Sequence, residues 1–164
     1  VRLRELKDQG RAVRGTGGDD LHRSIGYNFK LTNLQAAVGI GQLNYLQSRV
    51  ERQVRTCRLY EENLGGIDGL SLLKFREGEV PQWTDALIEK RDELCAYLES
   101  EGIGSRKYWL PIHTQAPYRL PDDGFPNSTR LSPKALWLPS AFTLSDSDVL
   151  AVCGHIKKFL GKLT

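Results

Sequence analysis

The stretch Gly26-Tyr-Asn-Phe-Lys-Leu-Thr-Asn-Leu-Gln-Ala-Ala37 opens the longest regular pattern in the sequence. Within it, Thr32 and Gln35 have the spacing of a capping box, in which two side chains satisfy the free N–H groups of a helix's first turn. Apolar residues then recur every three or four positions as far as Leu64, which is typical of an amphipathic helix. Because Gly65 and a further glycine follow, the pattern predicts one helix of roughly 48 Å that ends in a left-handed C-cap.

The rest of the chain predicts a small sheet with two further helices. Strands are expected at 70–75, 83–88 and 135–139, an extended segment at 103–111, and helices at 90–101 and from Ser145 onward. The separations between these elements are short, so we expect an α/β fold, an α+β two-layer sandwich with a mainly antiparallel sheet. We expect residues 1–66 to hold the loop and the long helix, and residues 67–164 to form a small α/β domain.

The composition is that of an ordinary globular protein. The chain has 164 residues, of which 40% are hydrophobic, and no apolar run approaches the roughly 20 residues that span a bilayer. The net charge of +3 comes from interspersed charges, which favours a solvated surface over nucleic-acid binding. The opening Val-Arg-Leu-Arg-Glu does not resemble a signal peptide. Three separated cysteines without a C-x-x-C pair fit reduced thiols, so we expect a cytoplasmic protein.

Few residues carry a catalytic or metal-binding signature. His22 and His113 occupy loops rich in glycine, proline and aromatic residues, where binding groups tend to lie; for each, ligand contact and structural hydrogen bonding are equally open. Arg106 and Lys107 stand beside two aromatic residues and could hold an anion, or they could cover apolar surface with their stems. No histidine has a metal-ligand spacing, and no serine or cysteine lies in a nucleophile motif. These residues alone leave the function open.

Five blocks of sequence together resemble one known family. They are Asp8-Gln-Gly-Arg11, Gly26-Tyr-Asn-Phe-Lys-Leu-Thr-Asn-Leu-Gln-Ala-Ala-Val-Gly39, Leu110-Pro-Ile-His-Thr-Gln-Ala-Pro-Tyr118, Leu136-Trp-Leu-Pro-Ser140 and Leu144-Ser-Asp-Ser-Asp148. In order and spacing they are similar to the DegT/DnrJ/StrS sugar aminotransferases, which are pyridoxal-phosphate enzymes of fold type I. The family more often has Asp-His-Gly-Arg in the first block. The resemblance covers nearly the whole chain and implies the C-terminal domain of such an enzyme.

The resemblance also shows what this chain lacks. Family members are more than twice as long, and their first part carries the Schiff-base lysine ahead of a Thr-Thr-Gly-Glu-Gly-Gly-like segment that is not found here. We therefore expect the C-terminal part of an aminotransferase, inactive alone, and assign a catalytic role to none of its residues. The alternative is a freestanding dimerisation or nucleotide-sugar-binding module without catalysis. No metal site is expected.

The resemblance implies a role for the loop before the long helix. In the family, an amino group moves from a donor, usually glutamate, to a keto sugar attached to a nucleotide, and the loop reaches across a homodimer to the partner's cofactor. This implies that Asn28 contacts the pyridoxal phosphate of the partner subunit, with Lys30 as a charge partner, and both side chains can donate to phosphate. Alternatively, Asn28 only caps a turn before the helix. The residues implied to lie near the nucleotide sugar are His22, Tyr27, Arg106 and His113.

Overall fold

The computed structural model describes residues 2–11, 22 and 24–161. The chain forms two compact units, residues 1–46 and residues 47–164, and each is described by itself. The boundary between the units falls after residue 46, whereas the sequence led us to expect it after residue 66. The helix α3 (Leu46–Leu64) contributes Leu59, Tyr60 and Leu64 to the core of the second unit. None of the described helices is long and apolar enough to cross a membrane.

The first unit contains the helices α1 (Arg2–Lys7) and α2 (Asn33–Leu43). The predicted capping box at the start of α2 is confirmed. The Gln35 N–H donates to Thr32 Oγ1 over 3.2 Å, and the Thr32 N–H donates to Gln35 Oε1 over 2.9 Å. These two reciprocal bonds fix the residue at which the helix begins.

The predicted long helix is divided in two, and this corrects the expectation of one unbroken helix to Leu64. The helix α2 ends at Leu43, and α3 covers Leu46–Leu64. Between them the Tyr45 N–H donates to Gln42 O over 3.1 Å, which is the tighter bond of a 3₁₀ turn. Asn44 keeps helical dihedral angles, with φ −60° and ψ −23°. The apolar rhythm therefore continues through the turn, and the sequence pattern does not reveal it.

The second unit is built on a four-stranded antiparallel sheet with the strand order β1-β2-β4-β3. The strands are β1 (Leu70–Leu72), β2 (Thr84–Ile88), β3 (Arg106–Lys107) and β4 (Ala135–Leu138). The register pairs Leu70 with Ile88, Thr84 with Leu138, and Arg106 with Trp137. The expected small antiparallel sheet is thus confirmed, although the extended segment at 103–111 contributes only β3 to it.

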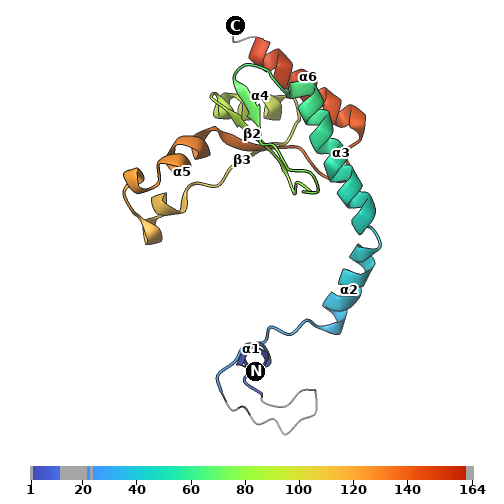
Figure 1. Cartoon of the computed structure of the whole chain (residues 1–164), viewed down its shortest axis with the longest axis vertical. Coiled ribbons are helices and arrows are strands. Elements are labelled where there is room, and N and C mark those ends of the chain that lie inside the picture. The colour runs from blue at the N-terminus through green and yellow to red at the C-terminus, as the bar shows by residue number, and fades with distance from the viewer. Residues whose placement is uncertain (1, 12–21, 23, 162–164) are drawn as a thin grey trace. The chain divides into compact units, whose positions relative to one another are not determined.

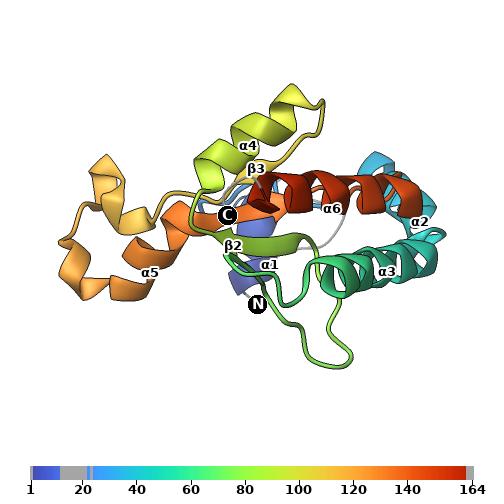
Figure 2. The ribbon, with the colours of Figure 1, turned by 90° about the horizontal axis from the view of Figure 1, so that it is seen from above.

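Helices cover one face of this sheet. The helix α4 (Arg91–Ser100) follows β2, and α6 (Asp146–Gly161) follows β4; both lie over the strands (Figures 1 and 2). The start of α6 is fixed by its predicted cap, because the Ser145 N–H donates to Asp148 Oδ2 over 2.8 Å and the Asp148 N–H donates to Ser145 Oγ over 3.2 Å. The expected two-layer α/β arrangement is therefore present in this unit.

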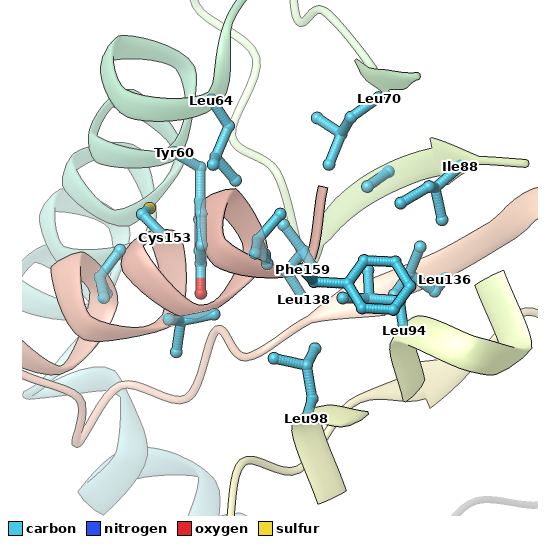
Figure 3. Packing of buried hydrophobic residues seen from close by; sticks show 14 of the residues in the cluster. Tyr60, Leu64, Leu70, Ile88, Leu94, Leu98, Leu136, Leu138, Cys153 and Phe159 are labelled. Carbon is cyan, nitrogen blue, oxygen red and sulfur yellow. The ribbon is translucent and has the colours of Figure 1, made fainter. Parts of the chain in front are cut away.

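The core lies between the helices and alternate residues of the strands (Figure 3). The strands contribute Leu70, Ala86, Ile88, Leu136 and Leu138, and the helices contribute Leu59, Tyr60, Leu64, Leu94, Leu98, Val149, Val152, Cys153, Ile156 and Phe159. Tyr60 is fully buried, and its hydroxyl donates to Pro139 O over 2.9 Å. Burial raises the pKa of the Tyr60 hydroxyl well above its ordinary value. The polar end of this aromatic side chain is thus satisfied inside the core.

A segment without strands extends beyond the sheet between β3 and β4 (Figures 1 and 2). It consists of short helical turns, η1 (Ile112–Thr114), η2 (Ala116–Tyr118), η3 (Asp122–Gly124), α5 (Pro126–Leu131) and η4 (Ser132–Lys134). The Ser132 hydroxyl donates to Trp109 O over 2.8 Å and so ties the two ends of the segment together.

Candidate functional site

The glycine–tyrosine–asparagine loop is held by backbone hydrogen bonds to the end of α1 and the residues that follow it. The Tyr27 N–H donates to Leu6 O over 2.6 Å, and the Phe29 N–H donates to Lys7 O over 3.0 Å. In the opposite direction, the Gln9 N–H donates to Tyr27 O over 3.0 Å. These bonds make a short antiparallel pairing, which we call the clasp (residues 6–10 with residues 24–30). The clasp therefore fixes the backbone of the loop ahead of α2.

Two glycines allow the segments of the clasp to cross closely. Gly10 has φ +81°, a conformation that side chains rarely adopt. A Cβ atom on Gly10 would overlap Ser24 O, and a Cβ atom on Gly26 would overlap Gly10 N. Both positions therefore require glycine.

The two predicted phosphate-binding residues differ in their surroundings. Asn28 is exposed, and its side chain makes no hydrogen bond with the described residues. Lys30 Nζ lies 2.7 Å from Asp8 Oδ2 in an ion pair. The N-cap of α2 is Thr32, four residues after Asn28. A free amide beside an ammonium group is a donor set that suits a phosphate.

The other two candidates of this unit also lie in or beside the clasp. His22 Nδ1–H donates to Gln9 O over 2.6 Å, and His22 pairs with Arg11 in a further antiparallel bridge. Tyr27 is exposed, and its ring stacks on that of Phe29 with the centroids 5.2 Å apart. The structure thus brings His22, Tyr27, Asn28 and Lys30 together on one short stretch of paired backbone.

In the second unit, His113 is a buried residue with several protein partners. Its Nε2 atom lies 3.2 Å from Thr129 Oγ1 and 3.3 Å from Asp122 Oδ1. Its ring stacks on Phe125 with centroids 4.5 Å apart and an interplanar angle of 12°. These contacts connect η1 with η3 and α5. Of the two roles left open for His113, structural hydrogen bonding therefore has protein partners in this structure.

Arg106 lies at one end of the sheet, where its guanidinium carbon is 5.2 Å from the ring centroid of Trp137. It lines a hollow of about 610 Å³ together with Trp83, Ser105, Phe142 and Thr143. His113 lines a different hollow, of about 500 Å³. The structure therefore does not bring Arg106 and His113 into one pocket. The neighbouring Lys107 is paired with Asp92 over 3.0 Å.

The two buried cysteines, Cys57 and Cys153, have no features of a nucleophile. Burial raises the pKa of Cys57 and of Cys153 to about 11, so both thiols are protonated at neutral pH and carry little of the reactive thiolate. Within the part of the chain that the structure describes, no group of three or more His, Cys, Asp and Glu side chains could hold a metal ion.

Sequence reasoning missed two residues that the structure places at these sites. Asp8 belongs to the first block of the family resemblance, but no role was given to it, because its partner Lys30 is distant in the sequence. Trp137 was expected only as a strand residue, and its contact with Arg106 depends on the strand register. The family block was the available signal for Asp8, and nothing in the local sequence indicated the contact of Trp137.

Known proteins resemble this chain in both sequence and structure. The sequence model of the DegT/DnrJ/EryC1/StrS aminotransferase family matches residues 1–157. The chain belongs to this family. The GDP-perosamine synthase of Vibrio cholerae is 29% identical over 94% of this chain and 43% of its own length.

Two solved structures of the family share the fold. The crystal structure of a DegT DnrJ EryC1 StrS aminotransferase from Brucella abortus is 32% identical, with a TM-score of 0.82, over 97% of this chain and 43% of that one. The crystal structure of DesV from S. venezuelae is 25% identical, with a TM-score of 0.86, over the same shares. This DegT/DnrJ/EryC1/StrS chain therefore spans less than half the length of these relatives.

Proposed function

We propose that this chain is the C-terminal part of a pyridoxal-phosphate-dependent aminotransferase that transfers an amino group, from glutamate, to a nucleotide-linked keto sugar. The observation that carries the proposal is the family match over residues 1–157. The substrate class is supported by the name of one relative, GDP-perosamine synthase, because this name refers to a nucleotide-linked sugar. In this proposal the enzyme is a cytoplasmic homodimer, and its Schiff-base lysine lies outside this chain.

Pyridoxal phosphate, when bound, supplies the electron sink for transamination. The part of this chain is to hold the phosphate of the partner subunit's cofactor. Asn28 donates an amide N–H to a phosphate oxygen, which its exposed and unbonded side chain permits. Lys30 adds a positive charge two residues further on. Because the clasp fixes the backbone of both residues, binding does not require the loop to become ordered.

Four other residues are proposed to contribute to the binding of the nucleotide sugar. His22 donates its Nδ1–H to Gln9 O, so in the neutral ring Nε2 is left as an acceptor for a sugar hydroxyl. The exposed ring of Tyr27 offers a flat surface and a hydroxyl. Arg106 is suited to a phosphate of the nucleotide, because its planar guanidinium can donate two parallel bonds. His113 supports the neighbouring segment through its buried contacts and contributes to the sugar site from there.

The alternative function is a freestanding dimerisation or nucleotide-sugar-binding module. The sequence encoded directly before Val1 separates the two. A continuous reading frame that carries the lysine segment supports the aminotransferase, whereas a start codon beside Val1 supports the module.

The test of the proposed function is the substitution of Asn28 in the complete gene product. Asn28→Ala removes one hydrogen bond to a charged phosphate, a bond worth about 1.5–3 kcal/mol, so the affinity for pyridoxal phosphate should fall by roughly ten- to a hundredfold. Asn28→Asp should weaken binding further, because a carboxylate repels the phosphate. An absorbance titration measures both affinities.

The matched control is Asn44→Ala, which removes another exposed amide of the first unit from outside the clasp. Its cofactor affinity should equal that of the wild type. The stability of the cofactor-free protein should barely change in either alanine variant. Unchanged affinity in both Asn28 variants would refute the proposed contact.

A further inference from the structure

The clasp contains one buried carboxylate. Asp8 is 8% exposed, whereas Asn28 is exposed and Lys30 is half-buried. Removing a carboxylate from water is unfavourable unless it is paired. Its partner is the Lys30 ammonium group, with Nζ at 2.7 Å from Oδ2. A buried acid is therefore aimed at one of the two residues proposed to bind phosphate.

The backbone explains why this carboxylate lies there. After Asp8 the chain turns through two residues with positive φ, Gln9 at +57° and Gly10 at +81°. Such a conformation is uncommon for a residue other than glycine. The turn is closed by the Gly10 N–H, which donates to Glu5 O over 2.8 Å. It directs the chain across Gly26 and so sets Asp8 against the loop.

The pattern of hydrogen bonds gives the side-chain geometry. The bonds flanking the Asp8–Asn28 bridge run from the Gln9 N–H to Tyr27 O and from the Phe29 N–H to Lys7 O. Asp8 and Asn28 are therefore a non-hydrogen-bonded pair, the kind whose side chains lie closest. In extended backbone, residues two apart point to the same side.

It follows that Asn28 and Lys30 share the side of the loop on which Asp8 lies. An ammonium group has three N–H donors, of which the ion pair with Asp8 needs one. The other two remain available for a phosphate.

We propose that Asp8 is a positioning residue for the phosphate-binding side chains of this loop. It holds the Lys30 ammonium group beside Asn28. The long lysine side chain is therefore already ordered before the phosphate binds, and less conformational entropy is lost on binding. This inference rests on the proposed function, because it concerns the same cofactor phosphate. Asp8 touches neither cofactor nor substrate and acts through Lys30.

The first experiment compares Asp8→Asn with Glu5→Gln. Both remove one negative charge from the same segment, but Glu5 has no ion pair with the described residues. In this chain without cofactor, Asp8→Asn should speed hydrogen exchange at the Tyr27 and Phe29 amides by about three- to tenfold. In the complete gene product it should weaken pyridoxal phosphate binding by about three- to tenfold. Glu5→Gln should change neither.

The second experiment asks whether Asp8 acts through Lys30. In a Lys30→Met background, Asp8→Asn should cause no further loss of cofactor affinity, whereas a merely structural role would lower it again. A full additional loss would overturn the inference. The inference would also be overturned if Asp8→Asn bound the cofactor as tightly as the wild type, or more tightly. In that case, the removal of a competing negative charge would outweigh any loss of positioning.

The outcomes also separate this inference from the proposed function. If Asn28→Ala loses affinity and Asp8→Asn does not, the positioning role alone is overturned. If neither variant loses affinity, the cofactor contact itself fails, and the positioning role fails with it.

Discussion

At the scale of single residues, Asp85 is the least satisfied acid of the second unit. It lies on β2 opposite Trp137, and its Oδ1 atom is buried without a hydrogen-bond partner among the described residues. Burial raises the pKa of the Asp85 carboxyl above its ordinary value. The indole N–H of Trp137 is likewise buried without a hydrogen-bond partner among the described residues. The ionised form is therefore disfavoured in the folded protein.

We predict that Asp85→Asn stabilises the second unit in a pH-dependent way. The carboxyl ionises at a lower pH in the unfolded chain, near its ordinary value of about 3.9, than in the folded one. Wild-type stability therefore falls as the pH rises through that window, and the penalty is complete above the folded pKa. The variant does not ionise, so its thermal midpoint should exceed that of the wild type at pH 7 and approach it at low pH.

The control for this prediction is an acid with the opposite shift. Asp92 accepts hydrogen bonds from Arg91 and Lys107, at 2.8 and 3.0 Å, which hold the pKa of Asp92 below its ordinary value. Asp92→Asn should lower the thermal midpoint at pH 7, and this loss should shrink as the pH falls below about 3.9. Equal effects of the two variants at pH 7 would contradict both assignments.

At the scale of elements, α2 is unusual because none of its residues is buried and none is charged. Its small residues leave room for another backbone, and a Cβ atom added at Gly39 or Gly41 would meet nothing within 4 Å. Glycine inside a helix is less favourable than alanine by about 1 kcal/mol.

We expect Gly39→Ala to raise the helix content and the stability of the first unit in this chain, by about 1 kcal/mol. Gly26→Ala is the comparison, because its Cβ atom would overlap Gly10 N and should open the clasp. Circular dichroism during denaturant unfolding measures both effects. A destabilising Gly39→Ala would show that the Gly39 position is already in contact with another backbone in solution.

The same helices show how far local sequence rules extend. The capping boxes at Thr32 and Ser145 were predictable, because both partners lie within one turn. The turn at Asn44 was not, because its dihedral angles remain helical.

In the candidate site, too, local sequence features were predictable and contacts between distant segments were not. The stretch around Asn28 was found through its sequence block. The ion pair of Asp8 with Lys30 and the burial of His113 were not foreseen, because they depend on contacts between distant segments.

At the scale of the whole molecule, many large apolar side chains are exposed. On α2 they include Leu34, Val38, Ile40 and Leu43, and in the segment between β3 and β4 they include Leu110, Ile112, Tyr118 and Leu120. Exposed apolar surface of this extent is typical of an interaction site.

We therefore expect this chain to self-associate or to have poor solubility when it is prepared alone. Light scattering over a range of concentrations should give a mass above the 18.5 kDa of one chain. Val38→Glu and Ile40→Lys, which place charges on α2, should reduce the association. A single species of 18.5 kDa at every concentration would contradict the prediction.

The glycine crossing has a practical consequence for engineering. The chain enters the segment between Arg11 and His22 next to the point where it leaves it. Its two ends are held together by the close approach of Gly10 and Gly26 and by the bridge between Arg11 and His22. In general, doubling the length of a segment between two joined ends costs only about 0.6 kcal/mol of closure entropy. A peptide tag or a fluorescent reporter grafted between Arg11 and His22 should therefore leave Asn28 and Lys30 where they are, and the graft would report on the loop from a few residues away.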